Sequence, residues 1–294
     1  MKSTQTSITA QGIAFVRAYE SSKPADQRIC NDPLARKLIS PALYHLFKLF
    51  VNSAEKRGPG MYGFLVARCR YIDDILQKQL SNGIQQLVIL GAGLDSRPYR
   101  FEALQKIKTY EVDSPATQAA KLAKVEAVLG EVPSHVTYVP VDFNVETLDK
   151  LFSFGFDPSL ETLIIWEGVT YYLTAEAVDR TLNFAMKNTS PSSSIVFDYI
   201  YTSALTSAHK RSEVVRMQRS QRITGEGLIF SIEEGSIESF LKARGFKLIE
   251  LMTSQDLHRA YFTGNNQNRT VAETYAIAHA QPHYYPGSNM NTVY

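Results

Sequence analysis

Glycine and acidic residues follow the ends of several short apolar segments, and their types and spacing could do chemistry. The first segment, 86–90, runs into Gly91 and Gly93, which leave no side chain between the backbone and a ligand. A helix that starts after such a turn offers free N–H groups at the same place. A structural tight turn has the same pattern, and Ser96 stands where a dinucleotide fingerprint has its third glycine. The turn alone therefore leaves both interpretations open.

A carboxylate ends the second apolar segment. Asp113 closes the sequence Tyr-Glu-Val-Asp, with Glu111 two positions earlier, and follows Gly93 at a spacing of about twenty residues. A carboxylate at this place can accept hydrogen bonds from both hydroxyls of a ribose. Asp113 could instead cap the helix that begins at Ser114. Together with the glycine turn, the ribose interpretation is favoured.

The third and fourth apolar segments also end in acids. Asp142 would accept from an adenine amino group and Phe143 would form an apolar wall, unless Asp142 only starts an Asx turn. Glu167 and Gly168 follow Leu-Ile-Ile-Trp, where a carboxylate is costly unless something polar meets it. Acids at three consecutive segment ends favour a positively charged nucleoside. S-adenosylmethionine, with its sulfonium and ammonium, fits this pattern better than a dinucleotide with two phosphates.

The elements that must position these residues alternate between strand and helix patterns. Runs rich in β-branched and aromatic residues predict strands at 86–93, 108–113, 136–142, 162–168, 194–200, 246–252 and 274–280. Helical patterns occupy 65–83, 114–130 and 174–188. This order predicts an α/β fold with a doubly wound, mostly parallel sheet, and the short separation of the last two strands predicts an antiparallel edge strand. Ligands of such sheets bind outside the carboxyl ends of the strands.

The composition is that of an ordinary globular protein and excludes several functional classes. Of the 294 residues 44% are hydrophobic, and 31 basic residues oppose 29 acidic ones, so no broad field for nucleic acid is present. No apolar run approaches the roughly 20 residues of a membrane span, and no signal peptide is recognised. The two cysteines lack metal-ligand spacing. We expect a cytoplasmic protein without a metal, a nucleic-acid partner or a membrane anchor; no pattern specifies its oligomeric state.

No linker divides the chain, so a single domain over 1–294 is predicted. It would consist of an N-terminal helical cap (1–85), a cofactor-binding half (86–198), a lid insertion (199–232) and the C-terminal strands (233–294).

Four segments in their order and spacing resemble the leucine carboxyl methyltransferase family: Gly-Ala-Gly-Leu-Asp-Ser-Arg from Gly91, Tyr-Glu-Val-Asp to Asp113, Val-Pro-Val-Asp-Phe to Phe143, and Trp-Glu-Gly-Val-Thr-Tyr-Tyr from Trp166. The resemblance covers nearly the whole chain. It implies the class I methyltransferase fold, with seven strands of which the last is antiparallel, and S-adenosylmethionine as the methyl donor.

The resemblance also implies roles for particular residues. The family's arginine before the first strand falls on Arg68, where it would pair with the methionine carboxylate of the cofactor, and a basic cofactor contact of the N-terminal segment falls on Arg17. The other positions agree with the analysis of the strand ends: Gly91 and Gly93 at the cofactor turn, Asp113 at the ribose, Asp142 and Phe143 at the adenine, and Glu167 near the methionine amino group.

The expected reaction is an in-line displacement in which an acceptor oxygen takes the methyl group and S-adenosylhomocysteine leaves. The sulfonium is already activated, so the protein mainly supplies alignment and exclusion of water. A carboxylate acceptor needs no base at neutral pH, whereas a phenol, with a pKa of about 10, would benefit from one. His209, His258 and His279 are candidate bases by residue type alone, so no catalytic residue is assigned.

The acceptor pocket is expected between the N-terminal helices and the insertion. Three tyrosines are candidates to line it, with core packing as the alternative: Tyr19, Tyr171 and Tyr199. In the basic run 210–222, Arg219 or Arg222 would meet an acidic substrate, unless the run is a solvated helix face.

The leading hypothesis is an S-adenosylmethionine-dependent O-methyltransferase acting on a small molecule of secondary metabolism. Methylation of a protein C-terminal carboxylate, an NAD-dependent oxidoreductase and a non-catalytic cofactor-binding protein are the alternatives.

Overall fold

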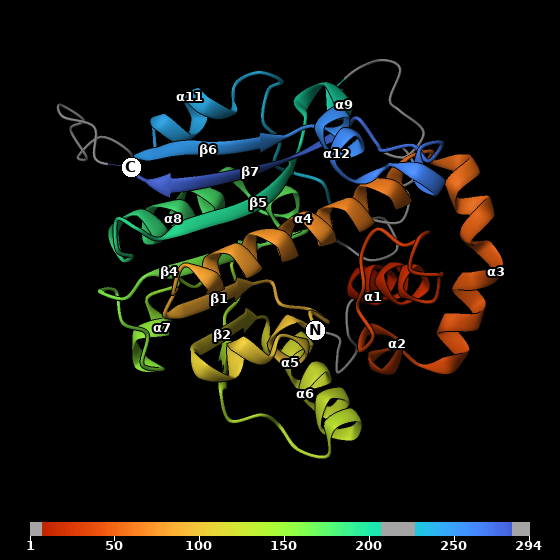
Figure 1. Cartoon of the computed structure of the whole chain (residues 1–294). Coiled ribbons are helices and arrows are strands. Elements are labelled where there is room, and N and C mark those ends of the chain that lie inside the picture. Colours follow the sequence, from red (N-terminus) through yellow and green to blue (C-terminus); the bar gives the residue numbers. More distant parts are fainter. Residues whose placement is uncertain (1–7, 207–226, 284–294) are drawn as a thin grey trace.

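A computed structural model describes residues 8–206 and 227–283 and shows one sheet with helices on both sides (Figure 1). Within these residues the sheet has seven strands: β1 (Gln86–Leu90), β2 (Lys108–Asp113), β3 (Val136–Pro140), β4 (Thr162–Trp166), β5 (Ser194–Ile200), β6 (Phe246–Met252) and β7 (Tyr275–Pro282). Their order is β3-β2-β1-β4-β5-β7-β6. The first five strands pair in parallel, and β7 pairs antiparallel with β5 and β6. The predicted doubly wound, mostly parallel α/β sheet is confirmed.

The sequence predicts that the antiparallel strand lies at the edge of the sheet, and this prediction is wrong for β7. It is inserted between β5 and β6, and β6 is the edge strand. The burial of the two strands explains this order. Seven of the eight residues of β7 are buried, whereas in β6 only Phe246 and Met252 at its ends are. A strand buried on both faces needs neighbours on both sides, and the more exposed strand takes the edge.

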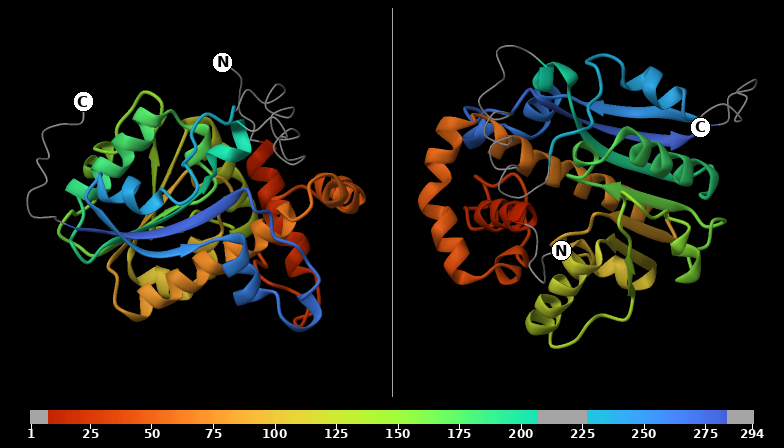
Figure 2. Two further views of the ribbon diagram at one scale, coloured as in Figure 1. Left: turned by 90° about the horizontal axis from the view of Figure 1, so that it is seen from above. Right: turned by 180° about the vertical axis from the view of Figure 1, so that it is seen from behind.

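Helices cover both faces of the sheet (Figure 2). One face packs against α7 (Lys150–Ser153), α8 (Ala175–Lys187) and α11 (Ile237–Lys242). The other face packs against α4 (Met61–Ser81) and α12 (Ser254–Tyr261). Successive side chains of a strand point to opposite faces, and in β1 they join the two apolar clusters alternately. The helices predicted at 65–83 and 174–188 correspond to α4 and α8.

The N-terminal helices form a third apolar cluster beside the glycine turn. α1 (Ile8–Ser21), α2 (Ala35–Leu38) and α3 (Pro41–Arg57) pack together, and Leu94 from the loop after β1 belongs to the same cluster. The Asp32 carboxylate accepts the N–H of Ala35 at 3.0 Å and so caps the turn that leads into α2. This packing places α1 over the carboxyl ends of the strands.

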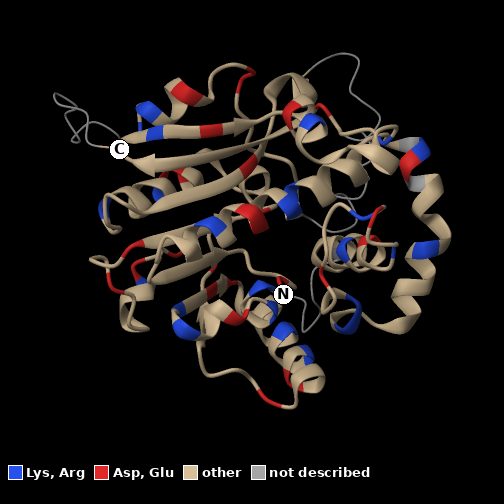
Figure 3. Ribbon diagram, in the orientation of Figure 1, with Lys and Arg blue, Asp and Glu red and all other residues tan. Residues whose placement is uncertain are grey.

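The helix α6 (Pro115–Leu129) and several short elements complete the described chain: α5 (Arg97–Arg100), η1 (Glu102–Lys106), η2 (Thr170–Tyr172), α9 (Thr202–Thr206) and η3 (Gly264–Asn266). The α6 helix confirms the prediction at 114–130. Basic and acidic residues are interspersed over the helices and loops (Figure 3), as the near-neutral net charge predicts. Among the described residues, no helix has the length and apolar character that a membrane span needs.

Candidate functional site

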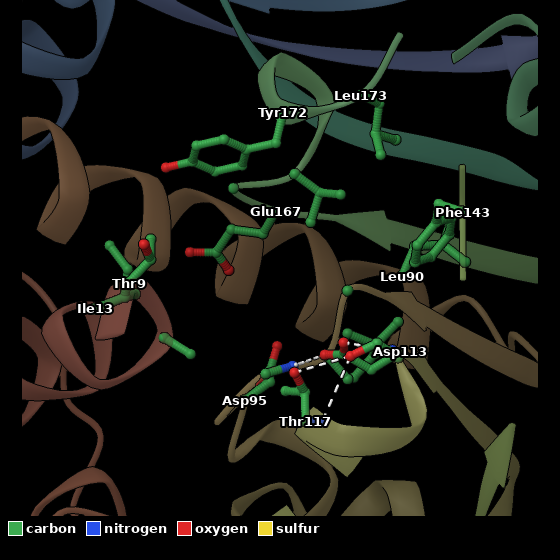
Figure 4. Close-up of a pocket in the computed structure, with 18 of the residues that line it drawn as sticks. Thr9, Ile13, Leu90, Asp95, Asp113, Thr117, Phe143, Glu167, Tyr172 and Leu173 are labelled. Carbon is green, nitrogen blue, oxygen red and sulfur yellow. Dashed lines mark hydrogen bonds between the residues drawn. The ribbon is translucent and has the colours of Figure 1, made fainter. Parts of the chain in front are cut away.

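A cavity of about 420 Å³ lies at the carboxyl ends of β1, β2 and β4. The order of the sheet reverses between β1 and β4, so this is the place where doubly wound sheets bind ligands. Figure 4 shows Asp113 and Asp95 on one wall of the cavity, Tyr172 and Leu173 on the opposite wall, and Glu167 between them, with Thr9 and Ile13 of α1 at one end. Most of the residues chosen from the strand ends therefore meet in a single pocket.

The glycine turn takes a conformation that side chains disfavour. Gly91 and Gly93 have φ angles of 65° and 44°, in the left-handed region. A Cβ on Gly91 would lie 2.3 Å from Cγ2 of Val169. Alanine at this position would therefore be strained in its backbone and would clash across the pocket. Both glycines line the cavity and leave their backbone open to a ligand.

Asp113 lines the cavity and holds the glycine turn in place. Its carboxylate accepts the N–H of Gly93 at 2.6 Å and the N–H of Ser114 at 2.7 Å. Ser114, and not Asp113, caps α6 with its side chain. Burial raises the pKa of Asp113, and the two backbone N–H groups oppose this rise. Each carboxylate oxygen keeps a second lone pair, so the residue retains the capacity to accept from a ligand hydroxyl.

Glu111 is not part of the pocket wall. It forms a buried ion pair of 2.6 Å with Lys121, whose Nζ also lies 3.5 Å from the carbonyl oxygen of Ala92 in the glycine turn. Burial raises the pKa of Glu111 to about 7. The strand β2 thus places Asp113 on the pocket wall, whereas Glu111 is buried against Lys121 outside the wall.

Asp142 and Phe143 form another part of the cavity wall. The expected Asx turn is present, because Oδ1 of Asp142 accepts the N–H of Asn144 at 3.0 Å. Asp142 is exposed, and Phe143 packs against the apolar core. The turn uses one carboxylate oxygen, so it does not remove the acceptor that the adenine interpretation needs.

Glu167 is held between two arginines at the pocket. Its Oε1 accepts from Nε of Arg68 at 3.0 Å and its Oε2 accepts from Nη1 of Arg97 at 2.7 Å. Burial alone would raise the pKa of Glu167, but the positive charges of Arg97 and Arg68 hold it below its ordinary value. The side chain is therefore an ionised carboxylate on the cavity wall.

Arg68 and Arg17 line the cavity, yet both are largely committed to protein partners. Besides Glu167, Arg68 pairs through Nη1 with Asp198 at 2.5 Å. Arg17 pairs with Asp32 at 2.8 Å and donates from Nη2 to the carbonyl oxygen of Leu94 at 2.6 Å. Among the described residues Arg68 has no hydrogen bond from Nη2, the nitrogen left for a ligand carboxylate. These internal partners are not evident from the sequence.

The arginine–carboxylate network links all of these charges. It consists of Arg17, Arg68, Arg97, Arg100, Asp32, Asp73, Asp95, Glu167 and Asp198, joined through ion pairs with side chains no more than 10% exposed. The sequence assigned site roles to Arg17, Arg68 and Glu167 but not to the other six members: Arg97, Arg100, Asp32, Asp73, Asp95 and Asp198. Asp95 and Arg97 belong to the segment Leu-Asp-Ser-Arg after the glycine turn, and this dense charge beside an apolar strand was the signal available.

The tyrosines expected at the acceptor pocket are placed elsewhere. Tyr171 and Tyr199 are 5% and 1% exposed and belong to the apolar core, and Tyr171 hydrogen-bonds to Arg68 at 3.4 Å. Tyr19 stacks on Phe15 among the N-terminal helices. Tyr172 lines the pocket instead, because the 3₁₀ turn of η2 directs consecutive side chains in different directions. Arg219, Arg222 and His209 lie outside the described residues.

The two described histidine candidates also lie away from the cavity. His258 stacks on Phe262 and contacts the carbonyl oxygen of Arg269 at 3.1 Å. His279 is buried in β7, where its Nε2 has no hydrogen-bond partner within residues 8–206 and 227–283. Burial lowers the pKa of His279 to about 4.

The buried His279 predicts a pH dependence of stability. The folded protein keeps it neutral down to about pH 4, whereas the unfolded chain binds a proton below about pH 6.5, so stability falls as the pH falls between these values. The effect amounts to roughly 3 kcal/mol of unfolding free energy below pH 4. Urea unfolding of the unmodified protein and of His279→Gln, from pH 7 to 4, measures it. Parallel curves for the two proteins would show that the histidine does not contribute.

Comparisons with known proteins agree on one family. The sequence model described as leucine carboxyl methyltransferase matches residues 10–186. YktD of Bacillus subtilis, named as an S-adenosyl-L-methionine-dependent methyltransferase, is 31% identical over 303 residues and covers 95% of this chain and 99% of its own length. Rv1729c of Mycobacterium tuberculosis, with the same description, is 27% identical over 254 residues, 82% of this chain and 80% of its own.

Two solved structures share the fold. A DUF574 family protein from Streptomyces avermitilis superimposes with a TM-score of 0.58 at 13% identity, over 95% of this chain and 98% of its own. A methyltransferase from Thermobifida fusca superimposes with a TM-score of 0.55 at 15% identity, over 96% of both chains.

Proposed function

Since this chain belongs to the leucine carboxyl methyltransferase family and is a methyltransferase that uses S-adenosylmethionine, we propose that it methylates an oxygen, hydroxyl or carboxylate, of a small molecule. The observation that carries the proposal is the pocket at the switch point of the sheet. Its wall combines a glycine turn, the acids Asp113 and Glu167, and apolar side chains. A concave site with few polar groups among apolar ones is typical of small-molecule binding.

The pocket has the features that the cofactor requires. Gly91 and Gly93 open the backbone at the turn, as close approach of a nucleoside needs. Asp113 offers acceptors for ribose hydroxyls, and Glu167 offers an ionised acceptor for an ammonium. When bound, S-adenosylmethionine supplies an electrophilic methyl group on its sulfonium.

The proposed contacts of the cofactor follow from these positions. Asp113 would bind the ribose, Asp142 and Phe143 the adenine, and Glu167 the methionine amino group. Arg68 would use its Nη2 for the methionine carboxylate, with Arg17 nearby on α1.

The acceptor would lie beside Thr9, Ile13, Tyr172 and Ile229, which line the cavity next to Glu167. Apolar side chains there exclude water and align the acceptor oxygen. The described lining residues include no histidine and no lysine. A carboxylate acceptor is ionised at neutral pH without a base, whereas a phenol or an alcohol would need one.

Two alternatives have less support. A protein C-terminal carboxylate would share the chemistry, but a cavity of about 420 Å³ that would also hold the cofactor favours a small acceptor. An NAD-dependent oxidoreductase would place a pyrophosphate at the glycine turn, where Asp113 and Glu167 supply negative charge. The assignment to secondary metabolism and to the cytoplasm stays a prediction.

Transfer of a labelled methyl group tests the proposal. We expect the protein to label small aromatic and aliphatic acids in the presence of methyl-labelled S-adenosylmethionine, and the product to release its label in mild base, as an ester does. Phenols and alcohols, whose methyl ethers survive base, form the second arm. A peptide with a free C-terminus and its C-terminal amide form the third. Labelling of the free peptide alone would contradict the small-molecule proposal.

A further inference from the structure

Asp198 touches the pocket only through other residues. It lies on β5, is 0% exposed and does not line the cavity. Its Oδ1 accepts the N–H of Gly168 at 2.6 Å, and its Oδ2 accepts from Arg68 at 2.5 Å. Both of these partners line the cavity. Its carbonyl oxygen also accepts the hydroxyl of Thr170 at 2.6 Å, so Asp198 holds the start of the turn after β4.

The charge of the network is not balanced. Four arginines face five carboxylates, which leaves one negative charge in excess. Arg68 is shared by two of the carboxylates, Glu167 and Asp198. Asp113 and Asp142 add negative charge on the same cavity wall. In a buried site such charges are weakly screened by salt and act over several ångströms.

The methyl donor and its product differ by one charge. S-adenosylmethionine carries a sulfonium, an ammonium and a carboxylate, and so has a net charge of +1. S-adenosylhomocysteine lacks the sulfonium charge and is neutral overall. A cavity with excess negative charge attracts the donor more strongly than the product. The electrostatic contribution to binding is therefore smaller for the product than for the donor.

We propose that Asp198 is a positioning residue that orients Arg68 and Gly168, and that its charge raises the affinity of the site for the donor relative to that for the product. The inference rests on the proposed use of S-adenosylmethionine at this pocket. A purely structural role for Asp198 would predict something different, because a distorted pocket loses affinity for both ligands alike.

The test uses two variants with opposite changes of charge. Asp198→Asn removes the excess negative charge and leaves Arg68 paired with Glu167. Arg100→Gln removes a positive charge and so increases the excess of negative charge. Arg100 does not line the cavity. In this variant Asp73 remains paired with Arg97, and Asp32 remains paired with Arg17. Asp179→Asn is the matched control, since it removes the same charge from a partly exposed pair with Arg244.

Calorimetric titration of the full chain with sinefungin and with S-adenosylhomocysteine gives the preference. Sinefungin carries an ammonium in place of the sulfonium and is a stable mimic of the charged donor. We expect Asp198→Asn to lower the ratio of the affinity for sinefungin to that for S-adenosylhomocysteine roughly fivefold to twentyfold, because one buried charge is removed. Arg100→Gln should raise the ratio, and Asp179→Asn should leave it unchanged.

The outcomes separate the inference from the proposed function. Two results would overturn the inference about charge. One is that Asp198→Asn weakens the binding of both ligands equally, and the other is that the affinity ratio shifts in the same direction in Asp198→Asn and Arg100→Gln. If Asp198→Asn does not fold, an unchanged or lowered ratio in Arg100→Gln still overturns it. Binding of neither ligand to the unmodified protein would instead contradict the use of S-adenosylmethionine.

Discussion

Arg97→Met is expected to lower the unfolding free energy by about 3–5 kcal/mol, because it removes the shared partner of three buried carboxylates. Arg97 pairs with Asp73 at 2.7 Å, Asp95 at 2.6 Å and Glu167 at 2.7 Å. In the variant Asp73 keeps Arg100 and Glu167 keeps Arg68, but Asp95 loses its arginine. Urea unfolding at pH 7 measures the loss.

A matched substitution at an exposed pair controls for the loss of an arginine. Arg70 pairs with Asp74 on the outer side of α4, where the two side chains are 50% and 37% exposed. Arg70→Met should cost less than about 1 kcal/mol. Arg97→Lys should fall between the two, since an ammonium keeps the charge but not the planar fork. Equal losses in the two methionine variants would show that the buried network does not stabilise the fold.

Asp113→Ala is expected to weaken S-adenosylmethionine binding by roughly 1.5–3 kcal/mol, the cost of losing hydrogen bonds to a charged acceptor. The carboxylate would bind the ribose, and it also holds the N–H of Gly93 at 2.6 Å. Removing it therefore affects both the ligand contact and the shape of the glycine turn. Calorimetric titration measures the change.

Asp113→Asn separates these two contributions. The amide has one acceptor oxygen, so it can still accept the N–H of Gly93 but no longer accepts that of Ser114 as well, and the negative charge is removed. We expect an intermediate loss of affinity. Full affinity in the alanine variant would place the ribose partner elsewhere. The other carboxylate of β2, Glu111, would then be tested as Glu111→Gln.

The local patterns of the chain predicted the sheet and the residues at its carboxyl edge. Strands in a parallel sheet end at the same side, so Asp113, Asp142 and Glu167 had to gather once each ended a strand or followed it within two residues. The same reasoning gave the wrong position for β7, which was expected at the edge of the sheet and lies between β5 and β6. Separation along the chain predicts that two strands run antiparallel, but burial on both faces decides which of them lies inside the sheet.

The charge network could not be predicted from local patterns. Its ion pairs join residues far apart in the chain, such as Arg68 with Asp198 and Arg97 with Asp73. A sequence shows that these charges exist but not which of them pair. Arg68 was for this reason assigned to the cofactor alone, although Glu167 and Asp198 take two of its nitrogens.

Side-chain direction within a short turn was also beyond the sequence pattern. Tyr171 and Tyr172 are adjacent and chemically equal, and only the geometry of η2 puts the first in the core and the second on the cavity wall. The same holds for Thr9 and Ile13, which reach the cavity because α1 packs against the loop after β1.

Titration of the unmodified protein with two ligands tests the central claim most directly, namely that the acidic strand ends receive a cationic adenosyl methyl donor. The account predicts that sinefungin binds with one molecule per chain and that NAD gives no binding heat. Binding of NAD without binding of sinefungin would contradict it, because a pyrophosphate would then occupy the edge of the sheet where Asp113 and Glu167 lie.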